Sequence, residues 1–308
     1  TGNLMPKKHR FLVSFRQITS RTHNVEVSGS GLLPAPKIKK LNILLTMNLI
    51  LSAAAGYNWS QLEVFIRSLR KVYSEKVVLI LNNPNSELIS KLRDFDIDFL
   101  NTDIVPTDSY QSRYQYYSDY LNSNHNYKKV LLTDSRDVFF QNNPFDFPYR
   151  QELNFFLEDE HIANSSVNVK WIKRTVGNLA LQKIKNQFIS CCGQVIGTHE
   201  KILGYCNTMN SNISLYKYRP SFHSLLFKRK IKGWDQGIHN YLVYSDFFKN
   251  VDFYTNKNGD VATLTLNKSL NFNKNNRLVN GNGQEYSIIH QYDHFIDSFN
   301  NLIEEICN

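Results

Sequence analysis

The sequence predicts an α/β protein in which a mostly parallel sheet is flanked by helices and carries a small antiparallel portion in its second half. In the first half, short apolar runs alternate with stretches whose apolar residues recur at helical spacing, which is the pattern of βαβ units. The apolar runs of the second half are shorter and less regular. Hydrophobic residues form 42% of the 308 residues, so the chain can bury a sizeable core.

The first half supplies four predicted strands and three predicted helices. The first strand is interrupted by Thr46 and Asn48 and is shorter than the ~20 residues of a membrane span, so we interpret it as a buried strand. The first helix repeats apolar residues at helical spacing from Leu62 to Leu69. In chain order the segments are strand 43–52, helix 59–73, strand 77–81, helix 86–94, strand 97–100, helix 109–122 and strand 129–133.

The second half begins with two apolar runs that we predict to be strands. The second of these runs contains Cys191-Cys192-Gly193. A later helix opens with Gly233-Trp234-Asp235-Gln236-Gly237, which places an acid and an amide in its first turn. In chain order the segments are strand 153–157, strand 188–196, helix 199–208, helix 233–244, strand 251–254, strand 286–290 and helix 294–306.

Charge is unevenly divided along the chain. Residues 1–40 hold eight Lys or Arg and one acid, whereas residues 41–308 carry 28 basic and 26 acidic groups. The near balance of this larger part does not support an extended phosphate-binding surface, so we expect no nucleic-acid partner. We therefore predict a basic arm or linker at 1–40 and a single domain at 41–308. The arm either rests on an anionic membrane or glycan or is an inert tail.

The cysteines indicate a reducing compartment. Four cysteines are too few for a disulfide framework in a chain of 308 residues, and no CxxC pair suggests a zinc site. Cys191 and Cys192 have no recognisable His partner nearby in the sequence, so we interpret them as buried structural residues and not as nucleophiles.

Two acids stand where an apolar run ends. Asp134 and Asp137 follow the predicted strand 129–133 and precede another apolar run. The carboxyl edge of a parallel strand is where open α/β sheets bind ligands, and hard carboxylate oxygens suit Mg²⁺ or Mn²⁺ bound to a diphosphate. The alternative is that Asp134 caps the next turn while Asp137 pairs with an arginine such as Arg136. Arg136 either screens the two acids or contacts phosphate.

Two features close to this edge suit a nucleotide. Ser52-Ala53-Ala54-Ala55-Gly56-Tyr57 joins the first strand to the first helix, and its small residues let a ligand approach backbone N–H groups while Tyr57 could stack on a base. This loop is not a GxGxxG fingerprint, and its alternative role is close packing of helix on strand. Arg113, in the helix before the acidic strand, either reaches a phosphate or is a solvated helix charge.

Three later features bear on chemistry. Asp235 either caps its helix or acts in the reaction, as general base toward an acceptor or beneath the reacting sugar carbon. His290 ends an apolar strand and is either a core histidine or the third ligand to a metal held by two acids. His239 and His294 are weaker candidates because both fall within helical patterns. Glu158-Asp159-Glu160 ends a strand and either binds sugar hydroxyls or faces water.

In this order the motifs resemble the GT-A nucleotide-sugar glycosyltransferases over about residues 43–295. The run from Thr133 to Val138 is similar to the DxxD motif of collagen-type hydroxylysine glycosyltransferases, in which both acids and a late histidine hold Mn²⁺. The commoner DxD spacing would retain Asp137 alone. The resemblance implies a GT-A (Rossmann-like) fold and a metal set formed by Asp134, Asp137 and His290.

The resemblance also implies the other site residues. Asp235, in the Asp-Gln pair that opens its helix, would face the reaction. The domain would divide into a nucleotide-binding half at 41–150 and an acceptor-binding half at 151–308. Residues implied in donor binding are Ala54, Ala55, Gly56, Tyr57, Arg113, Asp134, Gly193 and Gln236.

The predicted activity is metal-dependent transfer of a hexose from a UDP- or GDP-sugar to a hydroxyl acceptor such as a glycan, as in polysaccharide biosynthesis. The alternatives are a nucleotidyltransferase that makes nucleotide-sugars and a non-catalytic carbohydrate-binding protein. The loop from Ser52 to Tyr57 lacks the basic residue that a triphosphate site usually carries. We expect Mn²⁺ or Mg²⁺ as the cofactor and a cytoplasmic location, with membrane contact through the basic arm.

Overall fold

The computed structural model describes residues 47–125, 127–217, 233–264 and 269–307. They belong to one compact unit that begins at Ile43. The predicted arm at 1–40 and the first four residues of the predicted strand 43–52 lie outside the described residues.

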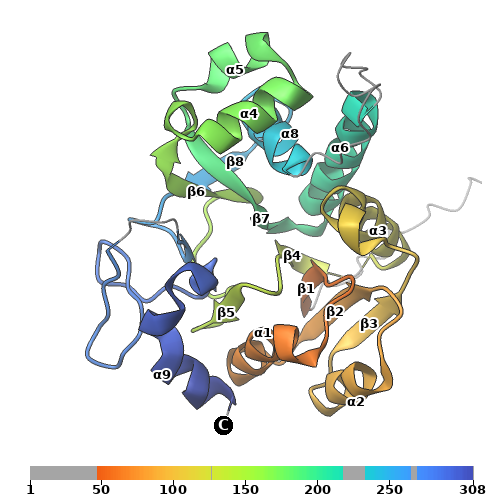
Figure 1. Ribbon diagram of the computed structural model, residues 1–308, viewed down its shortest axis with the longest axis vertical. Coiled ribbons are helices and arrows are strands. Elements are labelled where there is room, and N and C mark those ends of the chain that lie inside the picture. Colours follow the sequence, from red (N-terminus) through yellow and green to blue (C-terminus); the bar gives the residue numbers. More distant parts are fainter. Residues whose placement is uncertain (1–46, 126, 218–232, 265–268, 308) are drawn as a thin grey trace, which may run out of the picture. The chain divides into compact units, whose positions relative to one another are not determined.

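The main sheet confirms the predicted fold class. Its strand order is β3-β2-β1-β4-β7-β6-β8, and neighbouring strands are parallel except that β7 runs antiparallel to both β4 and β6 (Figure 1). The strands are β1 (Met47–Ala53), β2 (Lys76–Leu81), β3 (Asp98–Asn101), β4 (Tyr127–Thr133), β6 (Leu153–His161), β7 (Phe188–Thr198) and β8 (Val251–Tyr254).

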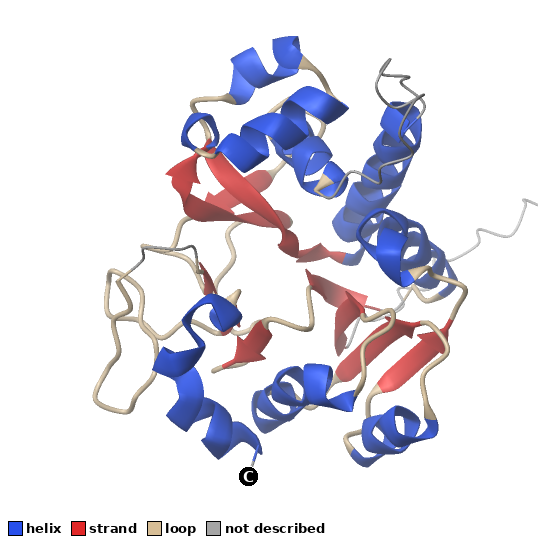
Figure 2. Cartoon of the chain, in the orientation of Figure 1, coloured by secondary structure: helices blue, strands red, loops and turns tan. Residues whose placement is uncertain are grey.

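Helices cover both faces of this sheet (Figure 1 and Figure 2). Alternate residues of β1 face opposite sides: Leu49 and Leu51 pack in a cluster with α3, α6 and α8, whereas Ile50 packs with α1 and α2. Among the described residues no helix combines the length and apolarity needed to cross a bilayer. The helices are α1 (Trp59–Val72), α2 (Ser86–Asp94), α3 (Ser109–Ser123), α4 (Ser166–Thr175), α5 (Asn178–Ile184), α6 (His199–Lys217), α8 (Trp234–Val243) and α9 (Ile296–Cys307), with 3₁₀ turns at η1 (Pro106–Asp108), η2 (Ile162–Asn164) and η3 (Tyr292–Phe295).

The second half departs from the sequence prediction in four places, one of which is strand β9 (Val261–Thr263), a short buried strand that was not expected. Helices α4 and α5 were not expected. Residues of low helix propensity, mainly β-branched, make up about half of α4, and α5 is only 7 residues long, too short to show a helical period. Helix α6 continues nine residues beyond its predicted end at residue 208, where burial of Met209 and Ile213 outweighs the weak propensity of an Asn-rich stretch. Strand β6 continues to His161, so the three acids predicted to follow it lie within it.

A small second sheet brings the end of the chain to the acids. Its order is β5-β10-β9, with β10 antiparallel to β5 and parallel to β9. In this register His290 pairs with Val138, the residue directly after Asp137, and the Gln291 N–H donates to the Asp137 carbonyl at 2.7 Å. The strands are β5 (Val138–Phe140), β9 (Val261–Thr263) and β10 (Ile288–His290).

Aromatic packing fixes this sheet to the C-terminal helix. Phe139, in β5, is fully buried. Its ring meets the rings of Tyr292 and Phe299 edge to face, with centroids 5.4 and 5.3 Å away. Such pairs add to the stabilisation from apolar burial. The strand that follows Asp137 is therefore anchored in its own hydrophobic cluster.

Replacement of this anchor should destabilise the fold. We expect Phe139→Ala to lower the free energy of unfolding by about 3–5 kcal/mol, because it leaves a cavity in a closed cluster. Urea denaturation measures the change. Phe247→Ala is the control, since Phe247 is 49% exposed and its loss should cost about 1 kcal/mol or less. Equal losses in the two variants would contradict the assigned packing.

Candidate functional site

Two acids lie at the carboxyl edge of β4. Asp134 directly follows the strand, and its backbone N–H donates to the Gly193 carbonyl of β7 at 2.8 Å. A tight turn then leads to Asp137 and into β5. With His290 these acids form a group whose ligand atoms all lie within 4.8 Å of one another. Among the described residues this is the group in which three metal-ligating side chains converge.

His290 lies between the two carboxylates. Its side chain is 2% exposed, and its Nε2 is 3.5 Å from Asp134 Oδ2 and 3.9 Å from Asp137 Oδ1. Its other ring nitrogen, Nδ1, is 3.7 Å from the thiol sulfur of Cys191. One nitrogen therefore faces the acids while the other is held by a thiol of β7.

The second oxygen of each carboxylate faces an arginine. Arg113 Nη1 donates to Asp134 Oδ1 at 2.5 Å. The Nη2 atom of Arg136 lies 3.9 Å from Asp137 Oδ2. Arg136 makes its closer contact, 3.0 Å, with Asp293. The alternative considered for Asp137, a pairing with Arg136, is thus present only at 3.9 Å, whereas Asp134 pairs with Arg113 instead of only capping a turn. His290 can approach both acids because it and the arginines use different oxygens.

These charges shift the pKa values within the group. Burial would raise the pKa of Asp134, but Arg113 and His290 outweigh burial and lower it to about 2. Burial raises the pKa of Asp137, and the adjacent Asp134 raises it further. Burial opposes a charged imidazole at His290, yet Cys191 and the two acids raise its pKa well above the usual value. The acids thus create a strong local preference for positive charge.

Arg113 also connects the acidic pair to Asp235. The arginine is 6% exposed and is not a solvated helix charge. Its Nη2 donates to Asp235 Oδ2 at 3.1 Å and to the Cys192 carbonyl at 3.4 Å. Burial raises the pKa of Asp235, whereas the nearby Arg113 lowers it. One guanidinium therefore joins an acid after β4 to an acid at the start of α8.

The backbone of β7 is tied to α8 by amide side chains. Gln236 accepts from the Cys192 N–H at 2.9 Å and donates to the Ser190 carbonyl at 2.8 Å. Asn240 accepts from the Ser190 N–H at 3.0 Å and donates to the same carbonyl at 3.1 Å. The Gln236 amide, expected to contact a donor, is thus hydrogen-bonded to the strand. These bonds set the distance between Asp235 and β7.

Buried His239 completes this connection. Its Nε2 lies 2.9 Å from Ser190 Oγ, and its Nδ1 lies 2.9 Å from the Tyr205 hydroxyl. Burial lowers the pKa of His239 to about 3, so the ring is neutral at ordinary pH. The helical pattern around His239 makes it a weak candidate in the sequence, and no local signal indicates its hydrogen bonds to residues of β7 and α6.

Gly193 makes room for the metal-ligating side chains. A Cβ atom at this position would lie 2.5 Å from Asp134 Oδ2 and 2.7 Å from His290 Cε1. Both distances are shorter than any normal van der Waals contact. The glycine predicted to back a donor sugar therefore lies directly against two members of the Asp-Asp-His group.

Two hollows adjoin the acids. A small one of about 70 Å³ borders the loop after β1 and includes Tyr57 and Arg136. A larger one of about 300 Å³ lies beside α4 and α8 and includes Trp171, Asp235 and Glu158. Arg113 and both acids line the two hollows, so the Asp-Asp-His group lies where they meet.

The structure brings only part of the predicted loop to this place. Ala55 and Tyr57 line the small hollow. Ala54 is 1% exposed and packs on the opposite side of the sheet, while its N–H donates to the Ile80 carbonyl at 2.9 Å. Gly56 has φ +78°, a conformation that glycine adopts without strain, and it turns the chain toward α1.

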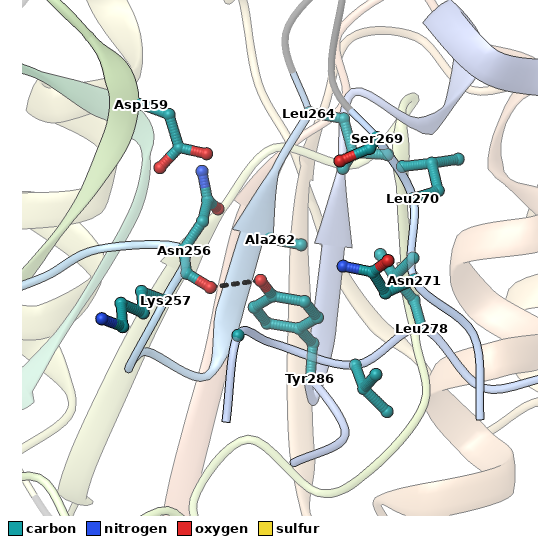
Figure 3. Close-up of a pocket in the computed structure, with 12 residues that line it drawn as sticks. Asp159, Asn256, Lys257, Ala262, Leu264, Ser269, Leu270, Asn271, Leu278 and Tyr286 are labelled. Carbon is teal, nitrogen blue, oxygen red and sulfur yellow. Dashed lines mark hydrogen bonds between the residues drawn. The ribbon is translucent and has the colours of Figure 1, made fainter. Parts of the chain in front are cut away.

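A third hollow, of about 240 Å³, lies beside β9 of the small sheet and is lined by none of the Asp-Asp-His group (Figure 3). Asp159 and Lys257 line it, and the Tyr286 hydroxyl donates to the Asn256 carbonyl within it. Successive residues of a strand point to opposite faces, so Glu158 borders the large hollow and Asp159 borders this one. The predicted acidic run thus serves two separate cavities.

Comparison with known proteins gives structural similarity alone. No protein-family model matches the chain, and no curated protein is significantly similar to it. The crystal structure of the glycosyltransferase GlyE in Streptococcus pneumoniae TIGR4 is similar with a TM-score of 0.42 and 16% identity, over 68% of this chain and 45% of that chain. Its apo form gives a TM-score of 0.42 and 15% identity, over 69% and 46%. The chain therefore spans less than half the length of these proteins.

Proposed function

We propose that the chain is a metal-dependent glycosyltransferase that moves a sugar from a nucleotide diphosphate sugar to a hydroxyl acceptor. The observation that carries the proposal is the convergence of Asp134, Asp137 and His290 where two hollows meet. The order of sequence motifs that resembles GT-A glycosyltransferases supports it. The lack of a basic residue from Ser52 to Tyr57 argues against a nucleotidyltransferase.

The three side chains fit a divalent cation. In an octahedral site with metal–ligand distances of about 2.1 Å, neighbouring ligand atoms lie roughly 3 Å apart. Asp134 Oδ2 and Asp137 Oδ1 lie 3.5 and 3.9 Å from His290 Nε2, so a small closure satisfies this geometry. The two carboxylates suit Mn²⁺ or Mg²⁺, and the imidazole favours Mn²⁺, the softer of the two ions. A cation held there would neutralise the charge of a departing diphosphate.

The neighbouring residues suit the rest of the donor. Ala55 and Tyr57 line the small hollow, where a small side chain allows close approach of a ligand and the ring could stack on a base. The large hollow holds polar and aromatic groups, including Asn168 and Trp171, which suit sugar hydroxyls and sugar faces. We assign the nucleotide to the first hollow and the transferred sugar and acceptor to the second. Ala54 is left out of this assignment because its side chain faces the opposite cluster.

Asp235 is the candidate for catalysis. Its carboxylate lines the large hollow, is 4% exposed and has a pKa raised by burial. A carboxylate with a raised pKa accepts a proton more readily. Arg113 fixes its position through the 3.1 Å hydrogen bond. Asp235 thus either accepts the proton of the acceptor hydroxyl or stabilises positive charge on the sugar carbon.

Mn²⁺ and a donor should stabilise the protein together. We expect Mn²⁺ with a UDP- or GDP-sugar to raise the melting temperature more than either alone, because both bind the folded state. At about 100 times Kd each ligand would add about 2.7 kcal/mol. Differential scanning fluorimetry and donor hydrolysis measure binding and turnover.

Matched variants test whether the acid pair is responsible. Asp137→Asn should abolish the Mn²⁺-dependent shift and lower turnover by at least roughly a hundredfold. Asp252→Asn is the matched control and should change neither the Mn²⁺-dependent shift nor turnover. Asp137 and Asp252 are each 19% exposed, and each lies near an arginine. Retained activity in Asp137→Asn would refute the assignment, and pyrophosphate release from UTP with a sugar phosphate would indicate a nucleotidyltransferase.

Gly193→Ala should displace the metal-ligating side chains. The new methyl group would lie 2.5 Å from Asp134 Oδ2, so we expect Mn²⁺ affinity to fall by roughly tenfold to a hundredfold while the chain still folds. Gly204→Ala is the control, since nothing lies within 4 Å of its added Cβ. Isothermal titration with Mn²⁺ compares them, and unchanged affinity in Gly193→Ala would contradict the site.

Metal binding should release a proton from His290. An imidazole must be neutral to bind a metal, and the neighbours of His290 raise its pKa. Mn²⁺ affinity should therefore rise with pH, by up to about tenfold per unit for one proton. Titrations in buffers of different ionisation enthalpy count the protons. His294→Asn, at an exposed histidine, should preserve the release, and equal affinity at pH 6 and pH 8 would contradict the ligand role.

A further inference from the structure

We propose that the outer faces of α4 and α5 dock this protein on an anionic membrane surface. This inference does not depend on the proposed function. The segment 161–199 contains five Lys or Arg and no Asp or Glu, although residues 41–308 together carry a net charge of only +2. All five cations lie in or directly after α4 and α5, at Lys170, Lys173, Arg174, Lys183 and Lys185.

Within the part of the chain that the structure describes, these cations are not neutralised by carboxylates. None of the five forms an ion pair with another described residue. By contrast, Arg150 and Lys201 each lie within 3.4 Å of a carboxylate. Cations in the last turn of a helix also favour the helix dipole, which accounts for Lys173 and Lys183 but not for Lys170 in the middle of α4. The segment therefore presents an uncompensated positive field.

Exposed aliphatic residues accompany the charges. Leu179 is 84% exposed, the highest value among the large hydrophobic residues of the described chain, and Val167 is 48% exposed. Leu179 lies one turn before Lys183 in α5, so both occupy the same helix face. Val167, Lys170 and Arg174 follow one face of α4 at the same spacing. Each helix thus combines an aliphatic side chain with cations.

This combination favours a lipid surface over a soluble anion. Phosphates of a polymer would attract the cations but would gain nothing from Leu179. At a bilayer the aliphatic group enters the acyl boundary, while the lysines extend their charged ends to the lipid headgroups. Each Lys or Arg near an anionic membrane adds to the attraction. The partner that matches both features is a bilayer that contains anionic phospholipid.

The position of α4 gives such docking a consequence. Asn168 and Trp171 of the same helix line the large hollow, and α4 and α5 lie together at one end of the main sheet, opposite α1 and α2 (Figure 1). A membrane against the outer face of α4 would therefore lie next to that hollow. This consequence, unlike the docking itself, rests on the proposed function: an acceptor carried by a lipid could enter the hollow without leaving the surface.

Vesicle sedimentation of the full chain tests the proposal. We expect binding to phosphatidylcholine–phosphatidylglycerol vesicles, weak binding to pure phosphatidylcholine, and loss of binding at high salt. Lys173→Glu combined with Lys183→Glu should weaken binding by roughly tenfold or more, and Leu179→Ser should weaken it by roughly tenfold. Circular dichroism melting checks that the variants fold.

Two controls match these variants. Lys91→Glu combined with Arg93→Glu reverses the same number of charges on α2, and Leu215→Ser replaces a 64% exposed leucine on α6. Both controls should bind as the unchanged chain does. Equal binding by all variants would overturn the proposal and assign any membrane affinity to other residues. Binding that responds to charge but not to Leu179→Ser would also overturn it, in favour of a soluble anionic polymer.

Discussion

Three carboxylates converge at one partly buried edge of the sheet, and the free energy needed to keep them charged constrains the rest of the site. Asp134, Asp137 and Asp235 come from two distant parts of the chain. Buried acids are costly unless positive groups meet them. Arg113 bonds two of these acids, and His290 faces the third together with Asp134. The oxygens directed toward His290 are the ones available to a cation.

The fold places these groups through backbone hydrogen bonds. Strand β7 runs antiparallel within an otherwise parallel sheet, which sets the Gly193 carbonyl against the Asp134 N–H. The ladder between β5 and β10 brings His290 beside Val138. Amides of α8 hold Ser190, three residues before Gly193. The geometry of the group therefore depends on strand register, and not on flexible loops.

Much of the fold and part of the site follow from sequence patterns. Continuous apolar runs and helical spacing predicted most strands and helices of the first half to within a few residues, because most of these elements bury a continuous apolar face. Asp134, Asp137 and His290 could be predicted as site residues because each is a polar residue next to an apolar run. The contact between Arg113 and Asp235 joins residues 122 positions apart, and no local pattern encodes it. The β-branched helix α4 was missed because tertiary packing overrides its weak propensity.

The proposed site depends on one bound ion, so the location of that ion in a crystal is the most direct test. Crystals grown with MnCl₂ and measured at the manganese absorption edge would give anomalous difference density at the ion. We predict a single strong peak within about 2.0–2.3 Å of Asp134 Oδ2, Asp137 Oδ1 and His290 Nε2, with Arg113 still bonded to Asp134 Oδ1. Density absent from this position, with His290 still directed at both carboxylates, would contradict the account.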